Sequence, residues 1–419
     1  MYPSIIQARN ICYSTIVLDE EAYGSVEGVQ YYEVETGLGT YKFAQDPCGI
    51  LPQLLKELAE FRKMAKRSMA AAKDRGDAFM ESVYNGSQLA YKVSMNSVYG
   101  FAGASKGFLP CVPIAASVTA TGRAMIQQTK QLVESLVPGS RVVYGDTDST
   151  MCIFNLGDDK RHDIAAHFEV AERVAKEISQ TFPSPVELEF EKVYFPYLLF
   201  SKKRYAGNMY ISPDAPSYID VKGLQLVRRD NAPIVKEVSK SILDAIMNHK
   251  SRQKATDVAR EFLERVLDDE FPIEQYIVSK SLRTGYKNDA QPHVHVSRKI
   301  LQRTGQPVPS GSRVPYVFVE DLKNPDCLQA LKAEDPGYAA EHRLKLDYLY
   351  YIDHQLTSPI TSLLEILGVD VTKEIFQHVS IEHRIDSLRS NVSAAIKVAK
   401  RIRKNVKNNQ QEITCFFQA

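Results

Sequence analysis

Apolar residues recur at intervals of three and four in residues 52–73, which is the spacing of one buried face of an α-helix. Residues 79–98 predict a second helix, and only the short polar stretch 73–77 separates the two segments. We therefore expect an antiparallel helical pair, whose second helix ends at the glycines between residues 100 and 107. Further helices are predicted over residues 160–181, 344–367 and 371–403.

Strand signals lie between these helices. Apolar runs on both sides of a short acidic turn predict a β-hairpin over residues 141–154. Residues 1–40 are enriched in Tyr, Ile and Val in alternation with polar residues, which favours strands and turns. Glu187, Glu189 and Glu191 alternate with apolar residues, so we expect one strand face to carry all three. A solvated face is the ordinary outcome for such a row.

The turn of the hairpin carries Asp146 and Asp148, one residue apart. Two carboxylates this close repel each other, and burying them without a partner would cost several kcal/mol. A hard divalent cation with oxygen ligands would remove that cost. Asp and Gly are also common turn formers, so an ordinary surface turn is the competing interpretation.

The helical pair carries cations at helical spacing. Arg62 and Lys66 are four residues apart and share a face, and Lys92, Asn96 and Tyr99 share a face of the second helix. One guanidinium and two ammonium groups pointing into one volume would suit a triphosphate, because both groups neutralise phosphate oxygens. For the charged residues alone, a solvated face is the alternative. Asn96 and Tyr99, which we expect to be buried beside Gly100, are unusual in a helical bundle that has no ligand.

Composition narrows the possibilities. The 419 residues are 44% hydrophobic and 25% charged, which is typical of a globular protein with two or three domains. The net charge is +1, so any nucleic-acid surface must be local. Six scattered cysteines without a Cys-x-x-Cys pair argue against zinc and fit a reducing compartment. No apolar run approaches the ~20 residues of a membrane span, so we expect no membrane contact.

A compact basic cluster follows the glutamates. Lys202, Lys203 and Arg204 stand directly before Tyr205. Such a cluster suits a phosphate backbone, because each cation that neutralises a phosphate releases counterions. A basic turn without a ligand is the alternative.

Three motifs now stand in order along the chain: residues 2–6 (Tyr-Pro-Ser-Ile-Ile), residues 92–100 (Lys-x-x-x-Asn-Ser-x-Tyr-Gly) and residues 144–149 (Tyr-Gly-Asp-Thr-Asp-Ser). Their sequences, order and spacing strongly resemble the family B DNA polymerases. Within that family the chain resembles the replicative delta type of eukaryotes and large DNA viruses. The segments with that character are residues 190–199, 202–207 and 228–230.

The resemblance implies an α+β fold shaped as a right hand, with an antiparallel-sheet palm, helical-pair fingers and a largely helical thumb. The ranges implied are 1–44 and 108–225 for the palm, 45–107 for the fingers, 226–400 for the thumb, and 401–419 for a basic tail.

The implied chemistry is template-directed transfer of a deoxynucleoside monophosphate to a primer 3′-hydroxyl, assisted by two Mg²⁺ ions, for which Mn²⁺ is a substitute. Asp148 resembles the catalytic carboxylate that holds the metals, and Asp146 resembles its accessory neighbour. Glu191 resembles a glutamate close to the same metal cluster.

The resemblance also assigns substrate contacts. Arg62, Lys66 and Lys92 match finger residues that grip the triphosphate of a dNTP. Asn96 and Tyr99 match residues that line the nascent base pair, and Tyr2 matches the residue that packs under the sugar and excludes a ribose 2′-hydroxyl. The residues that match the primer–template duplex contact are Lys202, Lys203, Arg204 and Tyr205.

The sequence departs from the family pattern at its start. The family places an aspartate, the second carboxylate bridging the metals, a few residues before the Tyr-Pro-Ser segment, and here that segment follows Met1. The exonuclease domain and the delta-type cysteine modules are likewise absent from the 419 residues. We therefore expect a fragment, or one part of a split enzyme, that does not polymerise alone. The alternative is a non-catalytic, clamp-tethered DNA-binding module derived from a polymerase.

The last residues match the peptide pattern that sliding clamps bind, Gln-x-x-aliphatic-x-x-aromatic-aromatic. Its members here are Gln410, Ile413, Phe416 and Phe417. One helical turn would place the three apolar side chains on one face, ready for an apolar pocket. The competing interpretation is a terminal segment packed back on the thumb. With the replicative resemblance, this predicts a sliding clamp as partner and the nucleus or a viral replication compartment as location.

Overall fold

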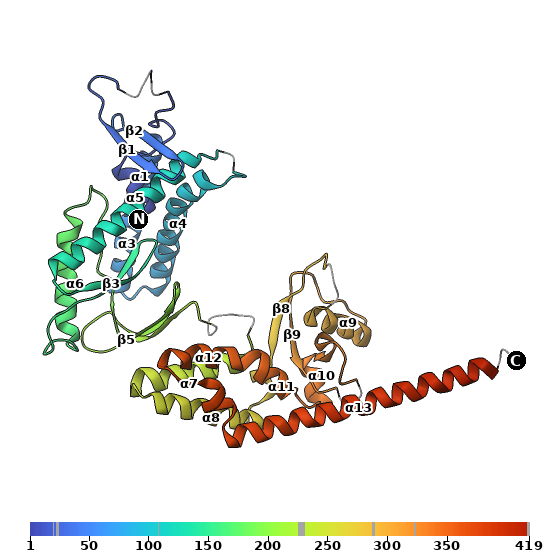
Figure 1. Cartoon of the computed structure of the whole chain (residues 1–419). Coiled ribbons are helices and arrows are strands. Elements are labelled where there is room, and N and C mark those ends of the chain that lie inside the picture. The colour runs from blue at the N-terminus through green and yellow to red at the C-terminus, as the bar shows by residue number, and fades with distance from the viewer. Residues whose placement is uncertain are drawn as a thin grey trace. The chain divides into compact units, whose positions relative to one another are not determined.

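A computed structural model of the chain describes residues 1–416, except for residues 20, 22–24, 108, 225–230, 287–289 and 322–323; for residues 404–416 it describes the backbone alone. Contacts divide the chain into two compact units. Unit 1 comprises Met1–Val193 and Tyr210–Pro216, and unit 2 comprises Tyr194–Met209 and Ser217–Ala419. Each unit is described by itself (Figure 1).

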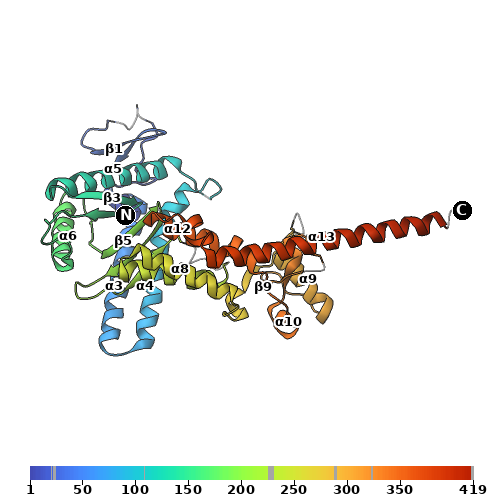
Figure 2. The same cartoon turned by 60° about the horizontal axis from the view of Figure 1, so that its bottom comes forward.

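The expected helical pair is confirmed in unit 1. Helix α3 (Ile50–Asp74) and helix α4 (Ala78–Gly103) pack side by side, as Figure 2 shows. Asp77 caps α4 by accepting a hydrogen bond of 3.0 Å from the Met80 amide. Helix α4 ends at Gly103, among the glycines where its end was expected, and it includes Gly100. A helical glycine costs only about 1 kcal/mol, which the packing of the pair outweighs.

The beginning of the chain is helical, whereas its composition favoured strand. Helix α1 (Tyr2–Ala8) starts with Pro3 in its first turn, where a missing N–H is tolerated. Ile5 and Ile6 are fully buried and share a core with α5 (Val112–Leu136). The expected strands come later in the segment, as the antiparallel hairpin β1 (Tyr31–Thr36) and β2 (Gly39–Ala44).

The predicted acidic hairpin is confirmed. Strands β3 (Arg141–Asp146) and β4 (Ser149–Ile153) pair antiparallel, with Asp146 opposite Ser149. The predicted helix 160–181 is also present, as α6 (Ile164–Ser179). In the described residues, the sheets of unit 1 are two separate two-stranded ribbons, β1–β2 and β3–β4.

The expected strand around Glu187, Glu189 and Glu191 is wrong. This segment joins no described strand, and β5 (Val193–Ser201) begins only after it. The Ser179 hydroxyl provides the missing backbone partners, since it accepts from the Leu188 amide at 2.8 Å and donates to the Leu188 carbonyl at 3.0 Å. The three glutamates are exposed, so solvent separates their charges.

Two antiparallel sheets of three strands belong largely to unit 2. Their strands are β5, β6 (Arg204–Tyr210) and β7 (Tyr218–Lys222) in one, and β8 (Val278–Ser281), β9 (Arg313–Phe318) and β10 (Ala333–Glu334) in the other. The first sheet lies within the range 108–225 predicted as palm, so the compact units divide that range. The predicted subdomain boundaries themselves stay a prediction.

Helices make up the rest of unit 2. The α-helices are α7 (Pro233–His249), α8 (Arg252–Leu267), α9 (Pro292–Thr304), α10 (Pro336–Glu341), α11 (Tyr348–Tyr350), α12 (Thr357–Leu364) and α13 (Val379–Phe416). The helix expected over residues 344–367 is broken, because a π-helical turn (Tyr351–Leu356) separates α11 from α12. A second π-helical turn (Thr372–Phe376) precedes α13. Short 3₁₀ turns cover Ile273–Tyr276, Gln329–Lys332 and Glu365–Leu367.

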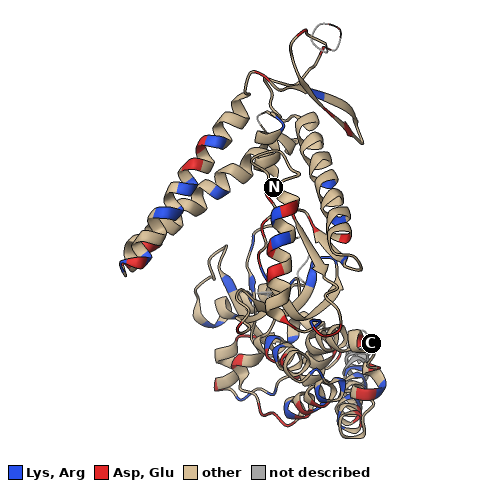
Figure 3. Cartoon of the chain, turned by 90° about the vertical axis from the view of Figure 1, so that its left-hand side faces the viewer, with Lys and Arg blue, Asp and Glu red and all other residues tan. Residues whose placement is uncertain are grey.

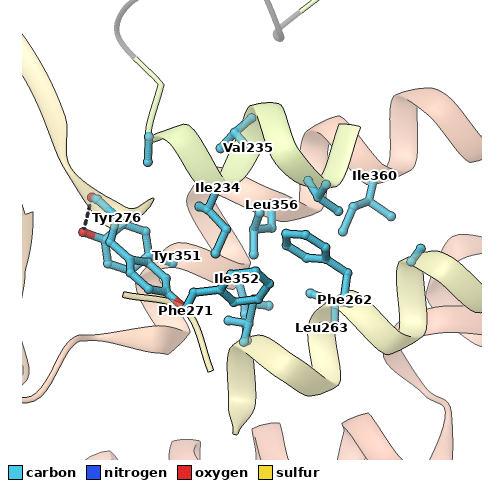
Figure 4. Close-up of a cluster of buried hydrophobic side chains, with 14 of the residues drawn as sticks. Ile234, Val235, Phe262, Leu263, Phe271, Tyr276, Tyr351, Ile352, Leu356 and Ile360 are labelled. Atoms are coloured by element: carbon cyan, nitrogen blue, oxygen red, sulfur yellow. Dashed lines mark hydrogen bonds between the residues drawn. The ribbon is translucent and has the colours of Figure 1, made fainter. Parts of the chain in front are cut away.

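The core of unit 2 gathers side chains from α7, α8, the π-helical turn and α12 (Figure 4). Tyr351 is fully buried at its edge. Its hydroxyl donates to the Tyr276 carbonyl at 2.8 Å and accepts from the Phe318 amide at 3.0 Å. The hydroxyl thus ties the π-helical turn to β9. Among the described residues, we find no helix with the length and apolar content that a bilayer crossing needs.

We predict that Tyr351→Phe lowers the free energy of unfolding by about 1–3 kcal/mol, because the buried Phe318 amide loses the acceptor that the Tyr351 hydroxyl provides. Urea denaturation of the full chain measures the change. Tyr218→Phe is the matched control, since Tyr218 is 59% exposed, and it should stay within about 0.5 kcal/mol of the parent. Equal effects of the two variants would contradict the role of the Tyr351 hydroxyl.

Candidate active site

The acidic turn of unit 1 is strained. The Asp148 amide donates to the Asp146 carbonyl at 2.6 Å, which closes a turn of three residues around Thr147. Thr147 has a φ of 54°, a left-handed conformation that β-branched residues rarely adopt. Strain of this kind costs about 1–3 kcal/mol and is concentrated at functional sites. Two-residue hairpin turns adopt this conformation at their first residue, usually with Asn, Asp or Gly, so the unusual feature is that a threonine occupies it.

The two carboxylates of this turn are open to solvent. The side chain of Asp148 is 60% exposed, and Asp146 is half-buried with one oxygen accepting from the Thr147 hydroxyl at 3.2 Å. The Met1 amino group lies 3.8 Å from Asp148 Oδ2. The start of α1 therefore lies next to the acidic turn. Carboxylate oxygens held this way fit a hard divalent cation that keeps several waters.

The three sequence motifs meet at Tyr2. The rings of Tyr2 and Tyr99 lie 4.2 Å apart between centroids, which joins the start of α1 to the end of α4. Burial raises the pKa of the Tyr2 phenol, and the nearby Tyr99 and Asp148 raise it further. The charge of Arg123, on α5, acts in the opposite direction. Tyr2, Tyr99 and Asp148 are thus neighbours, although they are far apart in sequence.

Arg123 and Gly122 were not identified from the sequence. A Cβ on Gly122 would meet the Met1 side chain at 2.9 Å, so the missing side chain allows α5 to approach the start of α1. Arg123 is the only charged residue of α5 before Lys130. A lone cation in the part of the helix before Lys130 was the available signal.

Of the cations of the helical pair that have a predicted role, Arg62 is half-buried and the two lysines are exposed; Figure 3 shows Lys and Arg positions of the pair in blue. The Arg62 Nε donates to Gln88 Oε1 at 3.4 Å, while Lys66 and Lys92 lie open to solvent. Asn96 is exposed as well, which corrects its expected burial, and Tyr99 is half-buried.

Glu191 is not gathered with the acidic turn. Its side chain is 73% exposed and lies 3.7 Å from the ammonium of Lys192. Among the residues that the structure describes, no three His, Cys, Asp or Glu side chains form a metal-binding group. The structure thus brings together the pair Asp146 and Asp148 alone, and a role for Glu191 stays a prediction.

The basic cluster forms the turn between β5 and β6 in unit 2. Lys202 and Lys203 are exposed, and Lys203 has a φ of 62°. A Cβ on Gly223 would lie 2.0 Å from the Lys203 carbonyl oxygen, so this position requires glycine. Behind the turn, Tyr205 packs against Tyr197 with ring centroids 5.6 Å apart. Arg204 is half-buried beside it.

Some predicted residues lie outside the description. The side chains of Gln410, Ile413 and Phe416 are not described, and neither is any part of Phe417. The segment 228–230, part of the delta-type resemblance, is also outside the described residues.

Comparisons with known proteins agree with this arrangement. The model of DNA polymerase family B matches residues 1–367. A DNA polymerase of Paramecium bursaria Chlorella virus NY2A is 52% identical over 423 residues, which cover 100% of this chain and 46% of that protein. The DNA polymerase delta catalytic subunit of Caenorhabditis elegans is 40% identical over 88% of this chain and 34% of that protein.

A solved structure gives the same result. The family B DNA polymerase of Pyrobaculum calidifontis superimposes with a TM-score of 0.62 at 27% identity, over 88% of this chain and 44% of that one. The mixture of helices and antiparallel sheets is therefore that of a polymerase fold. The chain belongs to DNA polymerase family B. It spans about half the length of the viral relative and about a third of the worm protein.

We predict that Thr147→Gly raises the free energy of unfolding of unit 1 by about 0.5–1 kcal/mol, because glycine adopts the left-handed conformation without strain. Thr40→Gly, at an exposed site in β2, is the control and should lower it by about 0.5–1 kcal/mol. Thermal unfolding followed by calorimetry measures both. If the two glycines destabilise equally, the turn stores no strain.

Proposed function

We propose that the chain carries the palm, fingers and thumb of a DNA-directed DNA polymerase of the replicative delta type. The reaction is transfer of a deoxynucleoside monophosphate from a dNTP to a primer 3′-hydroxyl, directed by a template. One observation carries this proposal: Tyr2, Tyr99 and the acidic turn lie together in unit 1. The proposed roles of these residues match the motifs they belong to in the family.

In this proposal Asp148 and Asp146 hold Mg²⁺, with Mn²⁺ as a substitute, and the exposed carboxylate of Asp148 fits such an ion. Bound divalent ions lower the pKa of a hydroxyl nucleophile and neutralise phosphate charge. The strained turn around Thr147 keeps both carboxylates at the tip of the hairpin.

The dNTP occupies the space between this turn and the helical pair. Lys92, Lys66 and Arg62 neutralise its triphosphate, and their exposure leaves Lys92 and Lys66 available for it. The rings of Tyr2 and Tyr99, which contact each other at an angle of 45°, face the sugar and base, and Tyr2 excludes a 2′-hydroxyl. Asn96 lines the nascent base pair.

Lys202, Lys203, Arg204 and Tyr205 contact the primer–template duplex through its backbone, without reading sequence. The tail from Gln410 to Phe417 binds a sliding clamp. These partners place the protein in the nucleus or a viral replication compartment.

The second bridging carboxylate of the family is not among the 419 residues. Residues that precede Met1 would enter beside Asp148, because the Met1 amino group lies 3.8 Å from it. We predict that these 419 residues extend a primer at least about a thousand-fold more slowly than the same chain lengthened upstream through that aspartate, since a lost metal ligand removes several kcal/mol of stabilisation. Primer extension with Mg²⁺ and four dNTPs measures this. Equal rates would show that another carboxylate replaces the missing one.

A non-catalytic, clamp-tethered DNA-binding module is the second candidate. The polymerase proposal predicts dNTP binding that requires Mg²⁺. Binding of primer–template DNA without any such nucleotide binding, even in the lengthened chain, would favour the second candidate.

We predict that Lys92→Ala weakens Mg²⁺-dependent dNTP binding by about ten- to a hundred-fold, because a hydrogen bond to a charged group contributes about 1.5–3 kcal/mol. Lys63→Ala is the control, since Lys63 is an exposed cation of the same helical pair without a proposed role. Fluorescence titration with a labelled dNTP measures both variants. An equal loss of dNTP affinity in both variants would show that Lys92 contributes only general electrostatic attraction.

A further inference from the structure

Helix α13 concentrates positive charge. No acidic residue stands between Asp386 and Glu412, whereas the whole chain has a net charge of only +1. The cations of this interval are Arg389, Lys397, Lys400, Arg401, Arg403, Lys404 and Lys407. The helix begins at Val379, beyond residue 367, where the match to the family model ends. Figures 1 and 2 show it running out from the rest of unit 2.

One face of α13 is fixed against unit 2. Ile385 is 4% exposed and Ala399 is 7% exposed, and both face the unit. Arg403 makes a two-pronged ion pair with Asp326, at 2.8 and 3.0 Å, and a further hydrogen bond to Asn324 at 3.2 Å. These contacts determine which way the opposite face points.

Other arginines of the helix are neutralised within unit 2. Arg384 pairs with Asp268, and Arg389 pairs with Asp353 at 3.3 Å. Their charges are used in holding the helix and are not available for a partner.

Among the cations of this interval whose side chains the structure describes, three remain, and we call them the α13 basic face: Lys397, Lys400 and Arg401. They are exposed, and spacings of three and four residues place them on one outward side of the helix. In the part of unit 2 that the structure describes, none of the three makes an ion pair within 4.0 Å. Lys400 acts on Asp326 only at longer range. Unneutralised cations in a row require an anionic partner or solvent.

We propose that the α13 basic face binds the sugar-phosphate backbone of duplex DNA; this rests on the proposed function, which supplies the duplex. Three cations within ~6 Å of helix axis form a compact positive cluster, which suits the closely spaced phosphates of a duplex. The helix has no aromatic residue before Phe416, so it offers nothing for unpaired bases to stack on, which argues against single-stranded DNA. The cores of protein interfaces are depleted of lysine, which argues against an acidic protein.

The contact is independent of sequence, because none of the three side chains is held by a second group that would orient it toward a base edge. Its contribution is therefore electrostatic. It lengthens the part of the duplex that the protein holds beyond the turn of Lys202 and Lys203, and it must weaken steeply as salt rises.

The test compares two triple-alanine variants of the full chain. One removes the α13 basic face. The control removes Lys236, Lys240 and Lys254, three exposed lysines of α7 and α8, so both variants lose the same charge. Binding of a primer–template DNA is measured by fluorescence anisotropy over a range of salt concentrations. Alanine favours helix, and circular dichroism confirms that α13 is retained.

We expect the basic-face variant to bind roughly ten-fold more weakly at low salt and its slope of log affinity against log salt to fall by about two to three, one unit for each lost phosphate contact. The control should keep the parent's slope. Equal slopes in both variants would overturn the inference while leaving the polymerase proposal intact. A parent chain without any DNA binding would instead contradict the proposed function.

Poly-L-glutamate is the second probe, because it distinguishes a face that binds an acidic protein from a face that binds DNA. If the basic-face variant loses affinity for this acidic polypeptide and keeps its affinity for DNA, the face is a protein-binding surface and the inference is wrong.

Discussion

The packing of α1 at the centre of unit 1 is the constraint on which the site depends. Ile5 and Ile6 are fully buried beside α5, and Gly122 allows the two helices to come this close. This packing fixes the start of α1, so that Tyr2 contacts the ring of Tyr99 and lies beside the acidic turn. A Cβ at residue 122 would press on the flexible end of the Met1 side chain at 2.9 Å and would only touch Ile5 at 3.5 Å, so the Met1 side chain would take up the change.

Charge is handled in two different ways in this molecule. Glu334 is 6% exposed in unit 2 and lies between Lys299 and Arg303, which hold its pKa below the usual range despite burial. Such a carboxylate holds β10 to α9 and has no remaining capacity for a ligand. Asp148, by contrast, is 60% exposed at the tip of a strained turn. The first arrangement serves stability, and the second leaves oxygen lone pairs available for a cation.

Regular local patterns were read correctly from the sequence. The helical pair, the acidic hairpin and α6 follow from periodicity, turn residues and capping, which are signals between residues only a few positions apart in the sequence. The errors fell where a distant group replaced a local partner. The Ser179 hydroxyl bonds the backbone of Leu188 and makes a strand unnecessary there, and burial against α5 makes residues 2–8 helical. Neither contact has a signature in the local sequence.

The sequence by itself determined the family, the acidic pair Asp146 and Asp148, and the cations of the helical pair, because these are residue types at fixed spacings. Only the tertiary structure decided that the rings of Tyr2 and Tyr99 meet, that Thr147 is strained, and that Glu191 lies apart from the acidic pair. It also decided which cations of α13 are neutralised. The physical reason is that spacing governs neighbours along one element, whereas contacts between distant segments depend on how whole helices and strands pack.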